Sequence, residues 1–214
     1  MNGIIVTGTD TGIGKTVLAA GLAGALARRH GVARYWKPVQ AGLEDMTDSQ
    51  SIAALAPGVT IHPEAYRLIT PASPHLAARI DGVVIDPVQL ALPSGEGPLV
   101  VEGAGGALVP LIAPPEGAPL LYADMFARWG LPVVVAARTM LGTINHTLLT
   151  VEALRARGVK IAGIAYVGDE NAETERVISA ISGVPRLGRI PLLDDLNADT
   201  LAAAMAGFDW DALA

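Results

Sequence analysis

Residues 4–17 read IIVTGTDTGIGKTV, in which an apolar stretch is followed by a glycine-rich turn and then by Gly-Lys-Thr. A strand, a loop and the start of a helix in this order typically bind phosphate, because backbone N–H groups and the positive end of the helix dipole face one anion. In such a loop Lys15 can reach the β- and γ-phosphates, and the Thr16 hydroxyl can ligate Mg²⁺. The segment therefore predicts a nucleotide-binding α/β protein.

This loop is one residue longer than the common G-x-x-x-x-G-K-[ST] pattern. The pattern requires glycine at the position of Thr9, whereas here Gly8 precedes Gly14 by six positions. A glycine turn that ends in Lys-Thr by coincidence is the alternative. The strand before the loop and the helix after it argue against that alternative, because they are the context that the motif requires.

Composition limits the classes of function. The chain has 214 residues, 51% of them hydrophobic, with no cysteine and a net charge of −6. We expect residues 1–214 to form one domain, located in the cytoplasm, since no apolar run reaches the ~18 residues of a membrane span and no signal peptide is visible. The lack of cysteine excludes disulfides and thiolate chemistry. The negative charge, without a basic stripe, argues against a nucleic-acid partner.

Strands and helices are expected to alternate along the chain. Clusters of apolar and β-branched residues predict buried strands, and amphipathic stretches between them predict helices. Residues 56–92 are expected to be irregular apart from a short helix near residues 75–80. The alternation predicts a largely parallel sheet flanked by helices, with ligands bound beyond the carboxyl ends of the strands. The expected strands are residues 3–7, 32–36, 98–102, 132–136 and 160–167, and the other expected helices are residues 14–29, 49–55, 118–129, 143–157 and 172–181.

Two charged residues end strands at this edge. Lys37 follows the strand of residues 32–36 and could neutralise a phosphoryl group, although an ordinary solvated lysine is an equal alternative. Glu102 ends the buried run of residues 98–102 and is followed by glycines. An acid at such a strand end typically holds Mg²⁺ in phosphate-loop enzymes, and we favour this role over an incidental glutamate.

Other candidate residues have weaker patterns. Glu44, Asp45 and Asp48 compete to be a further acid at the metal, and a solvated charge at a helix start is as plausible for each. Residues 141–146 follow a strand and open a helix, so their N–H groups could bind a carboxylate, while Thr143 could simply cap the helix. We interpret His146 as structural rather than catalytic.

Five motifs occur in order: GTDTGIGKT, KPVQAG, SPHLAA, VEGAGGALVPL and LGTINH. Together they resemble the dethiobiotin synthetases of the biotin pathway over about residues 3–168. The resemblance implies a homodimer of P-loop subunits that closes a cyclic urea from 7,8-diaminopelargonate, CO₂ and ATP, giving dethiobiotin, ADP and phosphate. It also implies that an amine takes up CO₂ as a carbamate, that the carbamate attacks the γ-phosphate, and that the neighbouring amine closes the resulting anhydride.

The resemblance also implies roles for individual residues. Lys37, Lys15 and Thr11 would be catalytic, and Mg²⁺ would be held by Thr16, Asp48 and Glu102, which selects Asp48 among the three acids. The resemblance places the carboxylate of the substrate on the helix start at 142–145, across the dimer interface. The implied ATP-binding residues are Gly12, Ile13, Gly14, Lys15, Thr16, Val17, Asp48, Glu102, Gly103, Ala104, Gly105, Val167, Gly168, Pro191, Leu192 and Leu193, and the implied substrate-binding residues are Thr11, Lys37, Ala41, Gly142, Thr143, Ile144 and Asn145.

The chain departs from the family pattern at three places. Gly12 replaces an acid that some relatives carry, and Ala41 replaces a hydroxyl that often contacts substrate. The segment of residues 165–169 lacks the asparagine that reads adenine in some members, for which Asp169 or Asn171 could substitute.

Two other families share this loop. Amide ligases of the cobyrinate type usually carry a glutaminase domain with a nucleophilic cysteine, and this chain has no cysteine. Switch ATPases of the MinD/ParA type place an extra lysine early in the loop, and residues 8–13 contain none.

Overall fold

Seven strands form the main sheet. The computed structural model describes residues 2–213, and its main sheet has the strand order β11-β10-β9-β1-β6-β2-β4. Every neighbouring pair is parallel, which confirms the predicted class of parallel sheet flanked by helices. The strands are β1 (Gly3–Gly8), β2 (Arg34–Trp36), β4 (Thr60–His62), β6 (Leu99–Gly106), β9 (Val133–Arg138), β10 (Ile161–Val167) and β11 (Arg186–Ile190).

Several short strands were not predicted. Strands β4 and β5 (Tyr66–Leu68) lie in the region that the sequence predicted to be irregular, and β11 forms the opposite edge of the main sheet. Strand β5 pairs with β3 (Val39–Ala41), and β7 (Pro110–Ile112) pairs with β8 (Leu120–Leu121). Apart from β11, which has five residues, these strands have two or three residues. So short a strand shows no detectable alternating pattern, and its pairing partner determines it.

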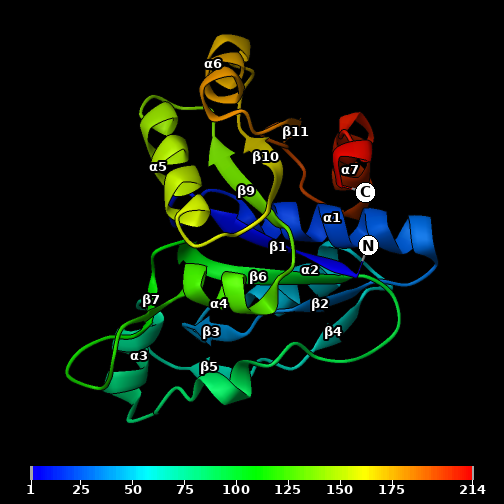
Figure 1. The fold of residues 1–214 in the computed structure, drawn as a ribbon. Coiled ribbons are helices and arrows are strands. Elements are labelled where there is room, and N and C mark those ends of the chain that lie inside the picture. The colour runs from blue at the N-terminus through cyan, green and yellow to red at the C-terminus, as the bar shows by residue number, and fades with distance from the viewer. Residues whose placement is uncertain (1, 214) are drawn as a thin grey trace.

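Helix α1 (Lys15–His30) is buried rather than amphipathic. Residues 18–26 are all buried. Figure 1 shows α7 (Ala198–Ala204), which was not predicted, beside α1. The 3₁₀ turn that follows α7 approaches α1 so closely that a Cβ on Gly21 would lie 2.6 Å from the sulfur of Met205. The C-terminal segment therefore covers the face of α1 that the sequence pattern placed in solvent.

The remaining helices match the prediction with shifted ends. The helix predicted at residues 118–129 begins at Tyr122, because β8 occupies the preceding residues. The short helix predicted near residues 75–80 is confirmed as α3. Among residues 2–213, no helix combines the length and the hydrophobicity that crossing a membrane requires. The other helices are α2 (Asp48–Leu55), α3 (Pro74–Asp81), α4 (Tyr122–Trp129), α5 (Thr143–Arg155) and α6 (Ala172–Ser182), with 3₁₀ turns η1 (Pro87–Leu90), η2 (Met205–Gly207) and η3 (Asp211–Leu213).

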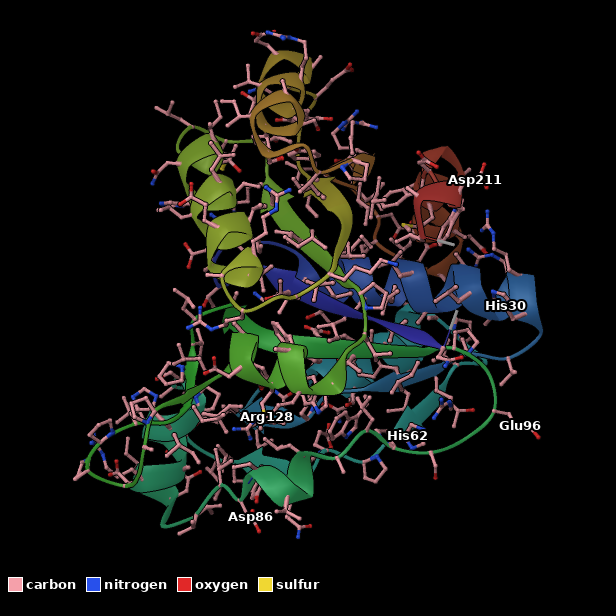
Figure 2. The ribbon with its side chains drawn as sticks, in the orientation of Figure 1. His30, His62, Asp86, Glu96, Arg128 and Asp211 are labelled. Atoms are coloured by element: carbon pink, nitrogen blue, oxygen red, sulfur yellow. The ribbon has the colours of Figure 1, made fainter. Side chains whose placement is uncertain are left out.

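The sheet separates two apolar clusters. Alternation along the strands places Ile4, Val6 and Tyr35 in the cluster with α1, and Ile5 and Trp36 in the cluster on the other face. The sheet is thus covered by helices on both faces (Figure 1). Charged side chains labelled in Figure 2, such as those of Asp86 and Glu96, are exposed at the periphery of the ribbon.

The carboxyl ends of β1, β2 and β6 meet at one edge. Val6 on β1 is in register with Glu102 on β6, and β2 pairs with the other side of β6. Residues 7–15, 37–42 and 102–106 therefore come together, as the sequence predicted. This edge positions the candidate site.

Candidate active site

A cavity of about 690 Å³ opens at this edge of the sheet. Its volume suits a small-molecule ligand. Residues of the phosphate loop form one wall, and residues that follow β2 and β6 form much of the rest. The predicted site residues that line the cavity are Thr11, Gly12, Ile13, Gly14, Lys15, Thr16, Val17, Lys37, Ala41, Asp48, Glu102, Ala104 and Gly105.

Glycine is required at three positions of the phosphate loop. Gly12 and Gly14 have positive φ values of 63° and 91°, which glycine adopts without strain. Glycine is favoured at position 8 for a different reason. A Cβ there would lie 2.6 Å from the Ile13 side chain and 2.9 Å from the Lys15 side chain. These glycines let the loop turn tightly against its own helix.

Charged side chains hold the extended tip of the loop. Lys15 Nζ donates to the Asp10 carbonyl at 2.6 Å, and the Asp10 carboxylate accepts the Thr11 N–H at 2.7 Å. Arg138, at the end of β9, donates to the carbonyls of Thr11 at 3.2 Å and Gly12 at 2.9 Å. Hydrogen bonds to the carbonyls of Asp10, Thr11 and Gly12 thus hold the loop in its extended form.

Lys37 lies in a buried charge cluster. Its Nζ is 2.5 Å from Asp48 Oδ2 and 3.3 Å from Glu102 Oε1, and it donates to the Gly103 carbonyl at 3.0 Å. Lys37 is 4% exposed and Glu102 is 1% exposed. The alternative of a solvated lysine is therefore wrong, and Glu102 is a buried partner of this lysine.

Three oxygen-bearing side chains converge at the start of α1. Thr16 Oγ1 donates to Asp48 Oδ1 at 3.0 Å and to Glu102 Oε1 at 2.8 Å. Asp48 is the first residue of α2, which Thr47 caps. Glu44 and Asp45 are exposed and lie outside the cavity, so Asp48 is the acid that reaches this cluster.

The cluster has the donor chemistry of a Mg²⁺ site. Mg²⁺ prefers oxygen ligands and usually keeps waters and phosphate oxygens among them, so one hydroxyl and two carboxylates are a suitable protein contribution. No group of three or more His, Cys, Asp or Glu side chains arranged for a metal occurs within residues 2–213. A metal here would therefore depend on a bound phosphate for further ligands.

Burial and neighbouring charges shift the pKa values of Lys15, Lys37 and Asp48. Burial, together with repulsion by Lys37, lowers the pKa of Lys15 to about 8. Burial opposes the charge on Lys37, but the carboxylates of Glu102 and Asp48 outweigh it and raise the pKa of Lys37. Burial likewise acts to raise the pKa of Asp48, but the ammonium of Lys37 and the Thr16 hydroxyl outweigh it and lower that pKa. Lys37 and Asp48 are thus an ion pair at neutral pH.

Known proteins can now be compared with this geometry. A family model described as an AAA domain matches residues 2–200. An ATP-dependent dethiobiotin synthetase of Rhodopseudomonas palustris (strain HaA2) is 62% identical, over 95% of this chain and 92% of the relative. One of Sphingopyxis alaskensis is 56% identical, over 98% of both chains. The chain belongs to the dethiobiotin synthetase family. It is accordingly an enzyme, a cyclo-ligase of the P-loop class, and the resemblance inferred from the five motifs is confirmed.

Solved structures show the same fold at low identity. A ParA family ATPase of Chlorobium tepidum has a TM-score of 0.55 at 11% identity, over 97% of this chain and 92% of that one. The cell division ATPase MinD of Pyrococcus furiosus has a TM-score of 0.54 at 14% identity, over 97% and 98%. These likenesses confirm the P-loop fold of this synthetase-family chain.

Val167, Gly168 and residues 191–193, which the resemblance implies bind ATP, lie outside the cavity. Val167 ends β10, and a Cβ on Gly14 would lie 2.8 Å from its Cγ1. Val167 is in register with Ile190, so Gly168 and the residues 191–193 follow neighbouring strands at the same edge. Of the two candidates to replace the missing asparagine, Asn171 caps α6 and donates to the Thr139 carbonyl, and Asp169 is exposed.

The helix start at residues 142–145 also lies outside the 690 Å³ cavity. Gly142 occupies the N-cap position of α5, so the alternative that Thr143 caps this helix is wrong. The Thr143 hydroxyl faces Thr147 instead, at 3.4 Å. His146, on the same helix, lines a second cavity of about 500 Å³ on the other side of Thr11. Residues 142–145 thus do not line the 690 Å³ cavity that contains the phosphate loop.

Sequence reasoning missed two side chains that support the site, Tyr35 and Arg138. Tyr35 is fully buried and donates to Glu102 Oε2 at 2.7 Å. A signal existed for Tyr35, because residues two apart on an extended strand share a face, and Tyr35 is two positions before Lys37. Arg138 had no such signal, since only the neighbouring position of β9 and β1 brings it to the loop.

Proposed function

We propose that this protein forms dethiobiotin from 7,8-diaminopelargonate, CO₂ and ATP in the 690 Å³ cavity, as a homodimer of single-domain subunits. One structural observation carries the proposal: the buried Lys37 ammonium lies between two carboxylates at the open end of a phosphate loop. The names of relatives at 56–62% identity support the same reaction.

The reaction has three steps. An amine nitrogen of the substrate bonds to CO₂ and loses a proton, giving a carbamate. A carbamate oxygen then attacks the γ-phosphorus, and ADP leaves with the electrons of the broken P–O bond. The second amine attacks the carbamoyl carbon and loses a proton, phosphate leaves with the electrons of the broken C–O bond, and the cyclic urea is complete.

The residues of the cavity suit these steps because phosphoryl transfer depends on positioning and charge neutralisation. Lys15 and the loop N–H groups bind the phosphates, and Lys37 stabilises the carbamate and the transferred phosphoryl group. Thr11 lies beside the amines. Thr16, Asp48 and Glu102 would hold Mg²⁺, which would neutralise phosphate charge. Ala41 lines the cavity without a side-chain hydroxyl, so the contact that a hydroxyl would make with substrate is either lost or made by the backbone.

A product assay tests this proposal. The protein is incubated with bicarbonate, Mg²⁺ and a panel of nucleoside triphosphates, with and without 7,8-diaminopelargonate. We expect dethiobiotin and ADP in equal amounts and little hydrolysis without the diamine. Hydrolysis that needs no diamine and is stimulated by DNA, lipid or a protein partner would favour the MinD/ParA-type alternative. ATP-dependent amide formation would favour the cobyrinate-type alternative.

A homodimer would explain why residues 142–145 lie outside the cavity. In a dimer, the start of α5 from one subunit would reach the substrate carboxylate in the other. Apolar side chains suited to such an interface are exposed nearby: Leu141 is fully exposed, and Leu108 and Leu149, both about half exposed, line the second cavity. Exposed apolar patches of this kind mark interaction surfaces.

Leu141→Asp is expected to convert the dimer to a monomer, because it places a charge in the apolar contact. The half-saturating diaminopelargonate concentration should rise at least about tenfold, the worth of one charge-assisted contact, while ATP affinity stays unchanged. Light scattering and steady-state kinetics measure both effects. Val84→Asp, at an exposed position before η1, is the matched control. A Leu141→Asp dimer with normal kinetics would contradict the assignment.

Arg138→Ala is expected to weaken ATP binding about fivefold, since two hydrogen bonds to the loop carbonyls contribute roughly 1 kcal/mol of net stabilisation. Displacement of a fluorescent ATP analogue measures the dissociation constant. Arg138→Lys is the control that keeps the charge and loses the paired geometry, and its affinity should be intermediate. An Arg138→Ala variant within twofold of the unmodified protein would show that the loop needs no such support.

A further inference from the structure

The two oxygens of the Glu102 carboxylate face different surroundings. Oε1 accepts from Thr16 Oγ1 at 2.8 Å and lies 3.3 Å from Lys37 Nζ, on the side of the cavity. Oε2 accepts from the Tyr35 hydroxyl at 2.7 Å. Glu102 is 1% exposed, so water does not supply the donors that a buried carboxylate needs. Tyr35 thus satisfies one oxygen and leaves the other available to the site.

We propose that Tyr35 is a positioning residue for the metal ligand Glu102, holding Oε2 so that Oε1 faces the bound metal and the phosphates. The inference rests on the proposed function in one respect, the role of Glu102 as a Mg²⁺ ligand. A hydroxyl that donates to a ligating carboxylate restricts its rotation and its orientation toward the metal. Tyr35 itself touches neither metal nor substrate.

The position of Tyr35 is suited to this role. Tyr35 lies on β2, which pairs with β6, the strand that carries Glu102. Its ring packs in the cluster with α1, on the side of the sheet from which Thr16 approaches. Packing on all sides holds the ring in one orientation, so the hydroxyl is a fixed donor. A charge-assisted O–H···O⁻ bond of this length is stronger than a neutral one.

A second buried tyrosine provides an internal control. Tyr166, on β10, is fully buried, and its hydroxyl has no hydrogen-bond partner among residues 2–213. Tyr35 and Tyr166 therefore share residue type and burial but differ in the bond to Glu102. Replacing each by phenylalanine removes one hydroxyl in both cases, and only the loss at Tyr35 removes a hydrogen bond to the carboxylate.

The test measures metal binding directly. Mn²⁺ is titrated into protein saturated with ADP, and the free ion is followed by electron paramagnetic resonance, so the result does not depend on diaminopelargonate or on turnover. We expect Tyr35→Phe to raise the Mn²⁺ dissociation constant about tenfold, within the range found for lost outer-sphere partners of metal ligands. ADP affinity without metal should stay within about twofold, and Tyr166→Phe should match the unmodified protein.

A double-variant cycle separates positioning from packing. In a Glu102→Gln background, Tyr35→Phe should change the Mn²⁺ dissociation constant less than a further twofold, since the first substitution has already altered the bond between the two side chains. An unchanged Mn²⁺ affinity in Tyr35→Phe, an equal loss in Tyr166→Phe, or an equal loss of metal-free ADP binding would each overturn the inference. If Tyr35→Phe does not fold, folding of the double variant would support the role, and failure of both would indicate packing alone.

Discussion

Lys37→Ala is expected to lower kcat for dethiobiotin formation by about three orders of magnitude, a loss of roughly 4 kcal/mol in transition-state stabilisation. The reason is that a buried ammonium acts most strongly where negative charge moves, and Lys37 lies between two carboxylates at the open end of the loop. ATP affinity should change less than about tenfold, because Lys15 and the loop N–H groups remain. Steady-state kinetics and ATP titration measure the two effects.

The control for this variant is Lys160→Ala, at an exposed lysine outside the cavity, which should retain full activity. Stability must be measured alongside, because removing one partner of a buried ion pair costs about 3–5 kcal/mol. Kinetics are therefore recorded well below the melting temperature of the variant. A folded Lys37→Ala protein with near-normal kcat would remove Lys37 from the catalytic residues.

Glu102→Gln is expected to raise the Mg²⁺ concentration for half-maximal activity at least about tenfold and to lower kcat about 100-fold, since the amide keeps the shape but loses the charge that a hard cation requires. Titration of activity with Mg²⁺ at fixed ATP measures the shift, and ADP binding without metal should be nearly unchanged. Glu64→Gln, at a carboxylate outside the cavity, is the matched control. An unchanged Mg²⁺ dependence would exclude Glu102 as a ligand.

The sequence was sufficient to predict the site residues that directly follow predicted strands. The loop and the ends of β2 and β6 could be placed together because parallel strands end at one edge, so the grouping of Lys15, Lys37 and Glu102 was predictable. Which acid joins them was not settled by spacing. The structure places Asp48 at the ion pair and leaves Glu44 and Asp45 exposed, because the capped start of α2 orients only Asp48.

Features that depend on distant parts of the chain were not predictable from pattern. The burial of α1 depends on α2 and the sheet and also on the C-terminal residues around Met205, which are far away in sequence. Strand β4 exists because β2 offers an unpaired edge. The support of the loop by Arg138 requires β9 to lie beside β1. In each case tertiary contact, rather than local propensity, determines the structure.

Transfer of oxygen from labelled carbon dioxide tests the central claim most directly. A single turnover is started with ¹⁸O-labelled CO₂, 7,8-diaminopelargonate, ATP and Mg²⁺, and phosphate and dethiobiotin are analysed by mass spectrometry before exchange with water. Because the carbamate oxygen that attacks the γ-phosphorus leaves with phosphate, we predict one labelled oxygen in phosphate and one in the urea carbonyl. Unlabelled phosphate, or phosphate released without dethiobiotin, would contradict the account.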